Sequence, residues 1–331
     1  MNAAVYPWQQ GAWARIRAMR RDNRLPHALL VSCPPGTGTR AFAEQVARSL
    51  LCTAGPDEAP CGHCAACRQY AARTHPDALW LEPEEPGKAI LVDAVRGLVD
   101  RLRLTAAGSS KTAIVDPADA MNVNAANSLL KTLEEPPGGS VLLLVSRRPA
   151  RLPATVRSRC QRISFGLPPR AVALEWLGEQ GVDDPDRWLS RAGGRPLAAL
   201  EWSRSAPGTD DAVVDALLEV LERGAVPPQA IAAGATLSLA SSIPLMIAVA
   251  EDLIRMAAAG EPASLRFPER VERLRAIAGR VDVRGLFDYL GELYGSMPGP
   301  SGSLRSDIQF EGLLSDAASI CRTRRKAAGG A

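Results

Sequence analysis

The stretch Ala28-Leu29-Leu30-Val31-Ser32-Cys33-Pro34-Pro35-Gly36-Thr37-Gly38-Thr39-Arg40 joins an apolar run to a glycine-containing turn and a helical pattern. A near-continuous apolar run is typical of a strand buried on both faces of a parallel sheet. The stretch therefore predicts a strand, a tight turn and the start of a helix, which together form the repeating unit of an α/β domain.

Apolar runs and helical patterns alternate along the chain up to about residue 165. The other runs are Ala78–Leu81, Thr112–Val115, Val141–Val145 and the shorter Arg162–Phe165. The helical patterns between them cover Arg40–Leu51, Val92–Arg103 and Asn124–Leu133, and Pro136-Pro137 ends the last one. This alternation predicts a parallel sheet that is covered by helices.

After Leu167-Pro168-Pro169 the pattern is helical to the end of the chain. We expect three short helices, then a long helix that has Ser242 as its N-cap and Pro244 in its first turn. A loop at Met297–Gly302, a helix near Ser306–Arg322 and a frayed basic tail should follow. The short helices are expected at Ala171–Gln180, Asp184–Ala192 and Pro196–Ser203. The predicted domains are an α/β domain at 1–166, a small helical domain at 167–207 and an all-helical domain at 208–331.

The composition is that of a globular protein, with 46% hydrophobic and 23% charged residues among 331. A formal net charge of only +3 gives no global field that would attract nucleic acid. No run approaches the roughly 18 apolar residues of a membrane span. Met1–Arg21 lacks the apolar core of a secretory signal. We therefore expect a cytoplasmic protein.

The turn in the opening stretch lies where a phosphate-binding loop of the pattern G-x-x-x-x-G-K-[S/T] would lie. Cys33, Thr39 and Arg40 replace the first glycine, the lysine and the hydroxyl residue, although Gly36 and Gly38 are present. Arg40 comes one residue after the lysine position, a rotation of about 100° on a helix, so it cannot replace the lysine. The sequence predicts a site that cannot hydrolyse ATP. Passive nucleotide binding stays open, as does an ordinary strand–turn–helix without any nucleotide.

A second element of ATP hydrolysis is also altered. Asp116 ends an apolar run, and Pro117 follows it where ATP-hydrolysing proteins of this pattern carry a glutamate. The Asp116 carboxylate could contact a magnesium ion, but Pro117 has no group that could polarise an attacking water molecule. This change also predicts that the chain does not hydrolyse ATP.

Four cysteines lie within 16 residues, at positions 52, 61, 64 and 67. Cys52, Cys61, Cys64 and Cys67 supply four thiolates at a spacing that suits one tetrahedral, structural Zn²⁺ ion. The nearby His63 is expected to point outward. Four cysteines without a metal are an alternative, and an iron–sulfur cluster is another, although the eight-residue gap does not match ferredoxin spacing.

The segment Arg147–Arg162 contains six arginines and no acidic residue. A solvated, charged surface is the ordinary interpretation of such a run. Its centre contains the triplet Ser158-Arg159-Cys160.

Four motifs occur in a fixed order: the cysteine cluster, Thr74-His75-Pro76-Asp77, Leu129-Leu130-Lys131-Thr132-Leu133-Glu134-Glu135-Pro136-Pro137 and Ser158-Arg159-Cys160. Together they resemble the AAA+ subunits of the bacterial DNA polymerase III clamp loader. Because the ATPase residues are altered, the resemblance favours the delta-prime family over the ATP-hydrolysing tau/gamma family. It covers about residues 25–165, and the helical remainder agrees only in length and character.

The resemblance implies an AAA+ α/β domain with a RecA-like parallel sheet, a small helical lid and an all-helical C-terminal collar. It also implies that Arg159, supported by Ser158 and Cys160, is an arginine finger for the ATP site of a neighbouring subunit. A guanidinium suits this role because it offers fixed, charged donors to phosphate oxygens. Alternatively, Arg159 caps a local turn or pairs within its own chain. In the lid, Leu197 stands where ATPase relatives carry a sensor arginine, and Arg195 comes two residues early.

The resemblance thus implies a non-hydrolysing stator that helps to load a sliding clamp onto primed DNA. The implied partners are the tau/gamma ATPase subunits and the delta subunit, and the segment Asn124–Leu133 would shape the face near DNA. A divergent ATPase that hydrolyses ATP in its own site is one alternative. A stand-alone zinc-dependent DNA-binding protein is another.

Overall fold

The computed structural model describes residues 5–55, 57–58, 60–85, 87–108, 110–205, 209–234, 239–260, 265–296 and 306–328. The chain divides into two compact units, Met1–Val172 and Ala173–Ala331. The predicted division into three domains stays a prediction, and its second boundary, at residue 207, lies outside the described residues.

The first unit is built on a parallel sheet of five strands in the order β2-β3-β4-β1-β5. This confirms the predicted parallel sheet. Each predicted apolar run contains or overlaps a strand. The side chains of β1, β3 and β4 are buried on both faces of the sheet, whereas Gln161 and Arg162 of β5 are exposed. The strands are β1 (Ala28–Ser32), β2 (Ala78–Leu81), β3 (Lys111–Val115), β4 (Ser140–Ser146) and β5 (Gln161–Ile163).

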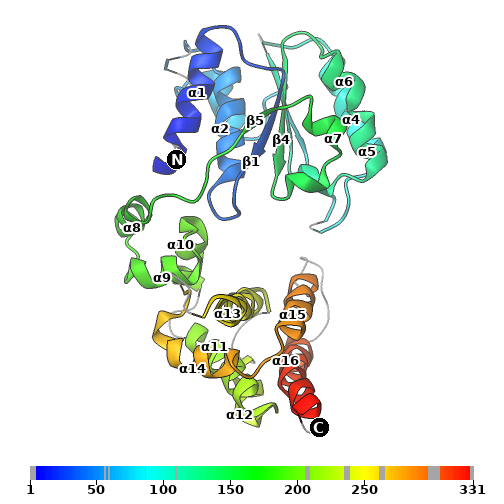
Figure 1. Cartoon of the computed structure of the whole chain (residues 1–331). Coiled ribbons are helices and arrows are strands. Elements are labelled where there is room, and N and C mark those ends of the chain that lie inside the picture. Colours follow the sequence, from blue (N-terminus) through cyan, green and yellow to red (C-terminus); the bar gives the residue numbers. More distant parts are fainter. Residues whose placement is uncertain are drawn as a thin grey trace. The chain divides into compact units, whose positions relative to one another are not determined.

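Helices cover both faces of this sheet (Figure 1). On one face, α1 (Gln10–Arg21) and α2 (Thr39–Leu51) pack with Leu29 and Val31 of β1. On the other face, α4 (Val92–Arg103), α5 (Val123–Ser128) and α6 (Leu130–Glu134) share a core with Leu30. Alternate residues of one strand therefore serve two hydrophobic cores, as the pleat of a strand requires.

One helix prediction in this unit is wrong. Asn124–Leu133 is not one helix, because α5 ends at Ser128 and α6 begins at Leu130. Leu129 is fully buried between them, and its N–H bonds to the carbonyl of Ala126, in the tighter i→i−3 pattern. The Ser128 hydroxyl also donates to the Ala125 carbonyl (2.7 Å), a local bond that competes with the helical pattern.

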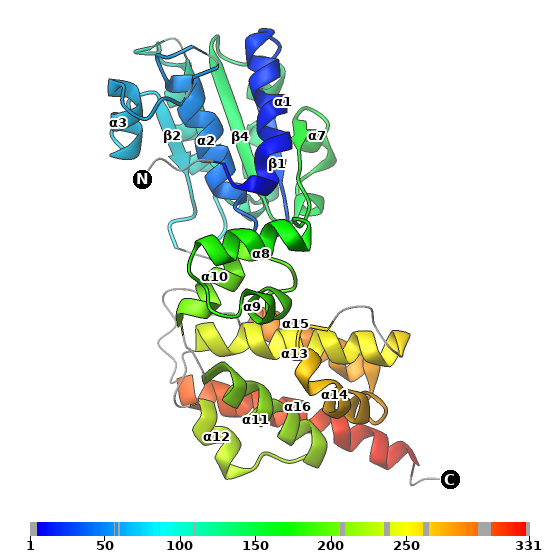
Figure 2. The same cartoon turned by 90° about the vertical axis from the view of Figure 1, so that its left-hand side faces the viewer.

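The remaining elements of the first unit are short. They are η1 (Pro7–Gln9), α3 (Ala65–Ala71), η2 (Ala118–Ala120), η3 (Pro149–Arg151) and α7 (Ala154–Arg157). Figure 2 shows α3 beside α2, with which it makes contact.

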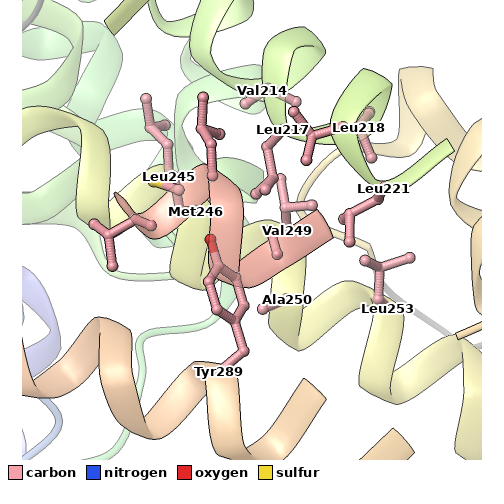
Figure 3. Close-up of a cluster of buried hydrophobic side chains, with 14 of the residues drawn as sticks. Val214, Leu217, Leu218, Leu221, Leu245, Met246, Val249, Ala250, Leu253 and Tyr289 are labelled. Carbon is pink, nitrogen blue, oxygen red and sulfur yellow. The ribbon is translucent and has the colours of Figure 1, made fainter. Parts of the chain in front are cut away.

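The second unit is helical throughout its described residues, as predicted, and α8 begins just before it. Figure 3 shows side chains of α11 and α13 facing one another, with Tyr289 of α15 reaching toward them. The elements are α8 (Arg170–Glu179), α9 (Pro185–Arg191), α10 (Pro196–Ser205), α11 (Thr209–Arg223), α12 (Pro228–Gly234), α13 (Leu239–Ala259), η4 (Pro268–Arg270), α14 (Val271–Ala278), α15 (Val283–Gly295) and α16 (Ser306–Ala328).

Two predictions about helix ends in this unit are wrong. Ser242 is not an N-cap, because α13 begins at Leu239 and contains Pro244. Leu239 and Ile243 are buried in the core, so the helix includes the turn before Ser242. The tail from Arg322 is not frayed up to Ala328, where α16 ends. The predicted loop Met297–Gly302 lies outside the described residues.

Among the described residues, none of the helices combines the length and the apolar character that crossing a lipid bilayer requires.

Candidate functional site

The loop between β1 and α2 is a tight turn formed by two glycines with left-handed backbone. Gly36 has a φ of 76° and Gly38 a φ of 85°, a region that favours glycine. Gly38 is also the N-cap of α2. The backbone of this turn therefore matches the strand–turn–helix that the sequence predicts.

Two of the altered residues of this loop, Cys33 and Thr39, bond to each other, and Cys33 also bonds to the backbone just after β5. The Cys33 sulfur accepts the N–H of Phe165 (3.4 Å) and shares a hydrogen bond with the side chain of Thr39. Burial raises the pKa of the Cys33 thiol to about 11, so it is neutral. The positions of the first glycine and the lysine are thus occupied by a buried pair of neutral side chains.

The segment Tyr6–Gln9 lies against the outside of the same loop. Trp8 Nε1 and Gln9 Nε2 both donate to the Thr37 carbonyl, at 2.8 and 2.9 Å. The rings of Tyr6 and Trp8 stack with centroids 5.0 Å apart. A Cβ atom at Gly38 would lie 2.5 Å from the Tyr6 ring, so only glycine fits beneath it. This contact was not predicted from the sequence, in which the aromatic residues Tyr6 and Trp8 were its only signal.

Arg40 lies among three carboxylates. Its guanidinium is 2.6 Å from Glu82, 3.1 Å from Glu44 and 3.5 Å from Asp116. Burial raises the pKa of Asp116, and the charges of Arg40 and Arg147 partly offset that effect. The position of Arg40 in the sequence predicted that it cannot replace the lysine, but these three carboxylate partners were not predicted.

A cavity of about 510 Å³ lies beside Arg40, at the carboxyl ends of β2, β3 and β4. Asp119, which lines it, accepts the Ser146 hydroxyl (2.7 Å) and the N–H of Arg147 (3.0 Å). The acidic residues that line the cavity therefore pair with Arg40 or accept hydrogen bonds from Ser146 and Arg147. The lining residues are Arg40, Glu82, Pro83, Gly87, Lys88, Ala89, Asp116, Pro117, Asp119, Ala120, Arg147, Arg148 and Arg151.

The four cysteines of the insertion converge at one point. The sulfurs of Cys52, Cys61, Cys64 and Cys67 all lie within 4.8 Å of one another. Backbone N–H groups donate to the sulfurs of Cys52, Cys61 and Cys64 at 3.4 Å. Four converging sulfurs with such donors fit a tetrahedral metal ion. His63 is exposed, as predicted, and does not belong to the group.

Secondary structure positions these cysteines. Cys52 is the C-cap of α2, and Cys64 is the N-cap of α3, where its sulfur accepts the N–H of Cys67. Burial would raise the pKa of Cys64, but hydrogen bonds from Thr53 and Cys67 lower it to about 5. A metal ion held here would join the end of α2 to the start of α3.

Arg159 follows α7, and its side chain is 37% exposed. Its Nε is 2.9 Å and its Nη2 2.5 Å from one oxygen of Glu134, while Nη1 donates to the Thr155 carbonyl (3.0 Å). Ser158 is exposed, and its hydroxyl also donates to Thr155. Cys160 is buried in the core, which raises its pKa to about 11. The triplet thus presents two polar side chains outward and anchors itself with the third.

Four other positions that the sequence singled out are described by their burial and hydrogen bonds. Leu197 is partly buried near the start of α10, and Arg195 Nε donates to the Ala192 carbonyl (2.6 Å). Lys131 is exposed on α6. The buried Asp77 of the Thr74–Asp77 motif accepts the N–H groups of Ala107 and Gly108, at 3.0 and 2.8 Å, so this motif holds a loop.

Comparisons with known proteins find similarity to subunits of DNA polymerase III. Residues 8–168 match the family model described as DNA polymerase III, delta subunit. DNA polymerase III subunit delta' of Pseudomonas aeruginosa is 46% identical over 202 residues, which cover 60% of this chain and 61% of that relative. The tau subunit of Bacillus subtilis is 34% identical over 145 residues, or 44% of this chain and 25% of that relative.

The matched segment therefore spans about three fifths of the length of the Pseudomonas relative. Among solved structures, a gamma subunit-related protein of DNA polymerase III from Thermotoga maritima aligns with 93% of this chain and 99% of that chain. Its sequence identity is 18% and its TM-score 0.41.

Proposed function

Since this chain is homologous over about three fifths of its length to DNA polymerase III delta' subunits, we propose that it is a clamp-loader subunit that hydrolyses no ATP itself. It acts as a stator, which holds its place in the ring and assists a neighbouring ATPase. Its partners are ATPase subunits of the tau/gamma type and a delta subunit, and the assembly loads a sliding clamp onto primed DNA.

The single observation that carries the non-hydrolysing role is the position of Arg40. Its guanidinium pairs with Asp116, Glu82 and Glu44, so a fixed protein cation lies where the carboxylate of a hydrolytic site would need a metal ion. Pro117 lines the same cavity and offers no acid or base. The buried pair of Cys33 and Thr39 leaves no lysine for the phosphates.

Arg159 is the group that acts on the neighbouring subunit in this proposal. It is partly exposed, permanently charged and anchored through Cys160 in the core. In the assembled complex it contacts the phosphates of ATP bound by the adjacent subunit. It thereby supplies the arginine finger that the sequence motif predicts.

We also propose that the chain binds one structural Zn²⁺ ion. The thiolates of Cys52, Cys61, Cys64 and Cys67 would hold it, and a site with four protein ligands has no open position for catalysis. Zinc would fix the insertion between α2 and β2.

The test is reconstitution of the complex with tau/gamma-type ATPase and delta subunits, followed by DNA-stimulated ATP hydrolysis. The chain alone should show no turnover. In the complex, Arg159→Ala should reduce hydrolysis at the adjoining site to background, because arginine fingers contribute about 10³–10⁵ in rate. Arg162→Ala, an exposed arginine on β5, is the matched control and should leave the rate unchanged.

Each contrary result points to a different function. Wild-type hydrolysis in the Arg159→Ala complex would refute the finger. Turnover by the isolated chain would favour a divergent ATPase of the tau type. Tight, strongly salt-dependent DNA binding by the isolated chain would favour a stand-alone DNA-binding protein.

A further inference from the structure

The carboxylate of Glu134 holds the guanidinium of Arg159 within the chain. One Glu134 oxygen is 2.9 Å from Nε and 2.5 Å from Nη2 of Arg159. The Thr155 carbonyl accepts from Nη1 at 3.0 Å. Arg159 is therefore held on two sides, by the last residue of α6 and by a residue of α7.

These contacts leave part of the guanidinium available. A guanidinium carries five N–H groups in a planar fork. Three of those in Arg159 are engaged, one each on Nε, Nη1 and Nη2. One N–H on Nη1 and one on Nη2 have no partner within the described part of the chain. Two N–H groups on the terminal nitrogens are what a bidentate contact with phosphate uses.

Both ends of the ion pair are attached to the core of the first unit. Glu134 follows Leu133, which is 3% exposed and whose carbonyl lies 2.8 Å from His27 Nε2. Arg159 precedes the buried Cys160, and its own N–H bonds to the Val156 carbonyl (3.2 Å). The helices α6 and α7 also contact each other. The direction of the Arg159 side chain is thus set by well-packed elements.

We propose that Glu134 is a positioning residue for Arg159. It fixes the Nε side of the guanidinium so that the two remaining N–H groups point outward, toward a phosphate in the neighbouring subunit. This inference rests on the proposed function, because it assigns Glu134 a role only if Arg159 acts on that phosphate. A preoriented donor contributes to rate because its orientation does not have to be established during the reaction.

The same ion pair has little value for the stability of the fold. The side chains of Arg159 and Glu134 are 37% and 52% exposed, and exposed ion pairs contribute little to folding. A purely structural role therefore predicts no effect of Glu134 on the reaction that depends on Arg159. Positioning predicts an effect that disappears when Arg159 is absent.

The experiment measures DNA-stimulated ATP hydrolysis by the reconstituted complex with Glu134→Ala, Glu134→Gln, Arg159→Ala and the double variant Glu134→Ala/Arg159→Ala. Glu134→Ala should lower kcat by about 10- to 100-fold, in the range that misplacement of a reacting group costs, with little change in KM for ATP. Glu134→Gln keeps an acceptor oxygen and the side-chain volume, so its kcat should be intermediate. The double variant should equal Arg159→Ala.

Glu135→Ala is the matched control, because Glu135 is the next residue, is exposed and does not contact Arg159. Unfolding midpoints of all variant chains are compared to show that they fold alike. The positioning role is refuted if Glu134→Ala keeps or exceeds the wild-type kcat, or if it lowers the rate further when Arg159 is already absent. If instead Arg159→Ala itself has no effect, the proposed function fails before Glu134 is tested.

Discussion

Single residues determine what the site between β1 and α2 can do. Arg40 is the clearest case, because one guanidinium lies within 3.5 Å of carboxylates from α2, from the residue after β2 and from the residue after β3. Asp116 is 6% exposed and has its pKa raised by burial. Arg40 is therefore the main local compensation for a buried negative charge.

Arg40→Ala should destabilise the chain by about 1–2 kcal/mol at neutral pH, because Asp116 loses a charged partner. Because the pKa of Asp116 is raised in the folded chain, protonation of Asp116 favours the folded state at a pH below its pKa in the unfolded chain. This contribution to stability is lost as the pH rises through the pKa of Asp116 in the folded chain. Removing Arg40 raises that pKa further. The destabilisation should thus shrink near pH ~4, close to the unfolded pKa of aspartate.

Urea unfolding of wild type and variant at both pH values measures this difference. Arg96→Ala removes an exposed arginine that pairs with Asp93 on α4 (3.2 Å), so it should change stability little at either pH. Equal destabilisation by Arg40→Ala at both pH values would mean that Asp116 is not the affected group.

At this scale the sequence predicted which residues are altered but not what they contact. Cys33, Thr39 and Arg40 could be compared with a known pattern, position by position. The contacts of Trp8 and Gln9 with Thr37 span 29 and 28 residues of chain. No local pattern encodes a contact of that separation, because it depends on where the whole N-terminal segment packs.

At the scale of elements, the strands were predictable and some helix ends were not. The pair α5 and α6 is interrupted at Leu129, where the chain forms a tighter turn and the Ser128 hydroxyl donates to the Ala125 carbonyl. The helix α13 begins three residues before Ser242, because Leu239 packs in the core and this packing outweighs the N-cap and proline signals. The strands β1, β3 and β4 had no such competition, since their apolar character and their burial agree.

The segment between α2 and α3 contains three of the four cysteines that could hold a metal ion. The purified chain should contain about one zinc ion, held by four thiolates. Cys64→Ser should lower zinc content about tenfold or more, because it removes a ligand and the α3 N-cap sulfur. Metal analysis measures the content, and hydrogen exchange should show faster exchange in the segment between Cys52 and Cys67 but not in β1.

Cys33→Ala is the control for this prediction, because Cys33 is a buried thiol outside the cluster and its loss should leave zinc content unchanged. A wild-type chain purified without zinc or another metal, and still resistant to exchange in this segment, would contradict the prediction.

At the scale of the whole molecule, the second unit contains a buried charge network. Arg191 at the end of α9 is 1% exposed and lies 2.6 Å from Asp211 and 2.9 Å from Glu269, and it also pairs with Asp210. Its guanidinium lies 5.5 Å from the centre of the Phe267 ring. One arginine thus connects α9, the start of α11 and η4.

Arg191→Ala should destabilise the second unit by about 3–5 kcal/mol, because it removes a buried guanidinium and leaves the buried carboxylate of Asp210 without its nearest cation. Burial alone would raise the pKa of Asp211. The hydrogen bond from Arg191 and the charges of Arg191, Arg187 and Arg270 outweigh burial, so this pKa is lowered. The stability that Asp211 contributes is present above its unfolded pKa and is lost as the pH falls through the folded pKa. The cost of the variant should therefore decrease in acid.

Hydrogen exchange resolved by segment measures this effect in each unit separately. Protection should fall in Ala173–Ala331 and stay unchanged in the sheet of the first unit. Arg223→Ala, which removes an exposed arginine that pairs with Glu219 (2.8 Å) on the same helix, should change neither. Equal loss of protection in both units would show that they unfold as one.

The sequence by itself determined the parallel sheet, the helical second half, the convergence of four cysteines and the loss of the ATPase residues. Each of these depends on residue types at short, fixed spacings, so local sequence patterns are enough to predict it. Only the tertiary structure decided that Arg40 neutralises Asp116, that Tyr6–Gln9 cover the loop and that Glu134 holds Arg159. These pairs lie 25 or more residues apart, and only packing of the sheet and its helices brings their side chains within hydrogen-bonding distance.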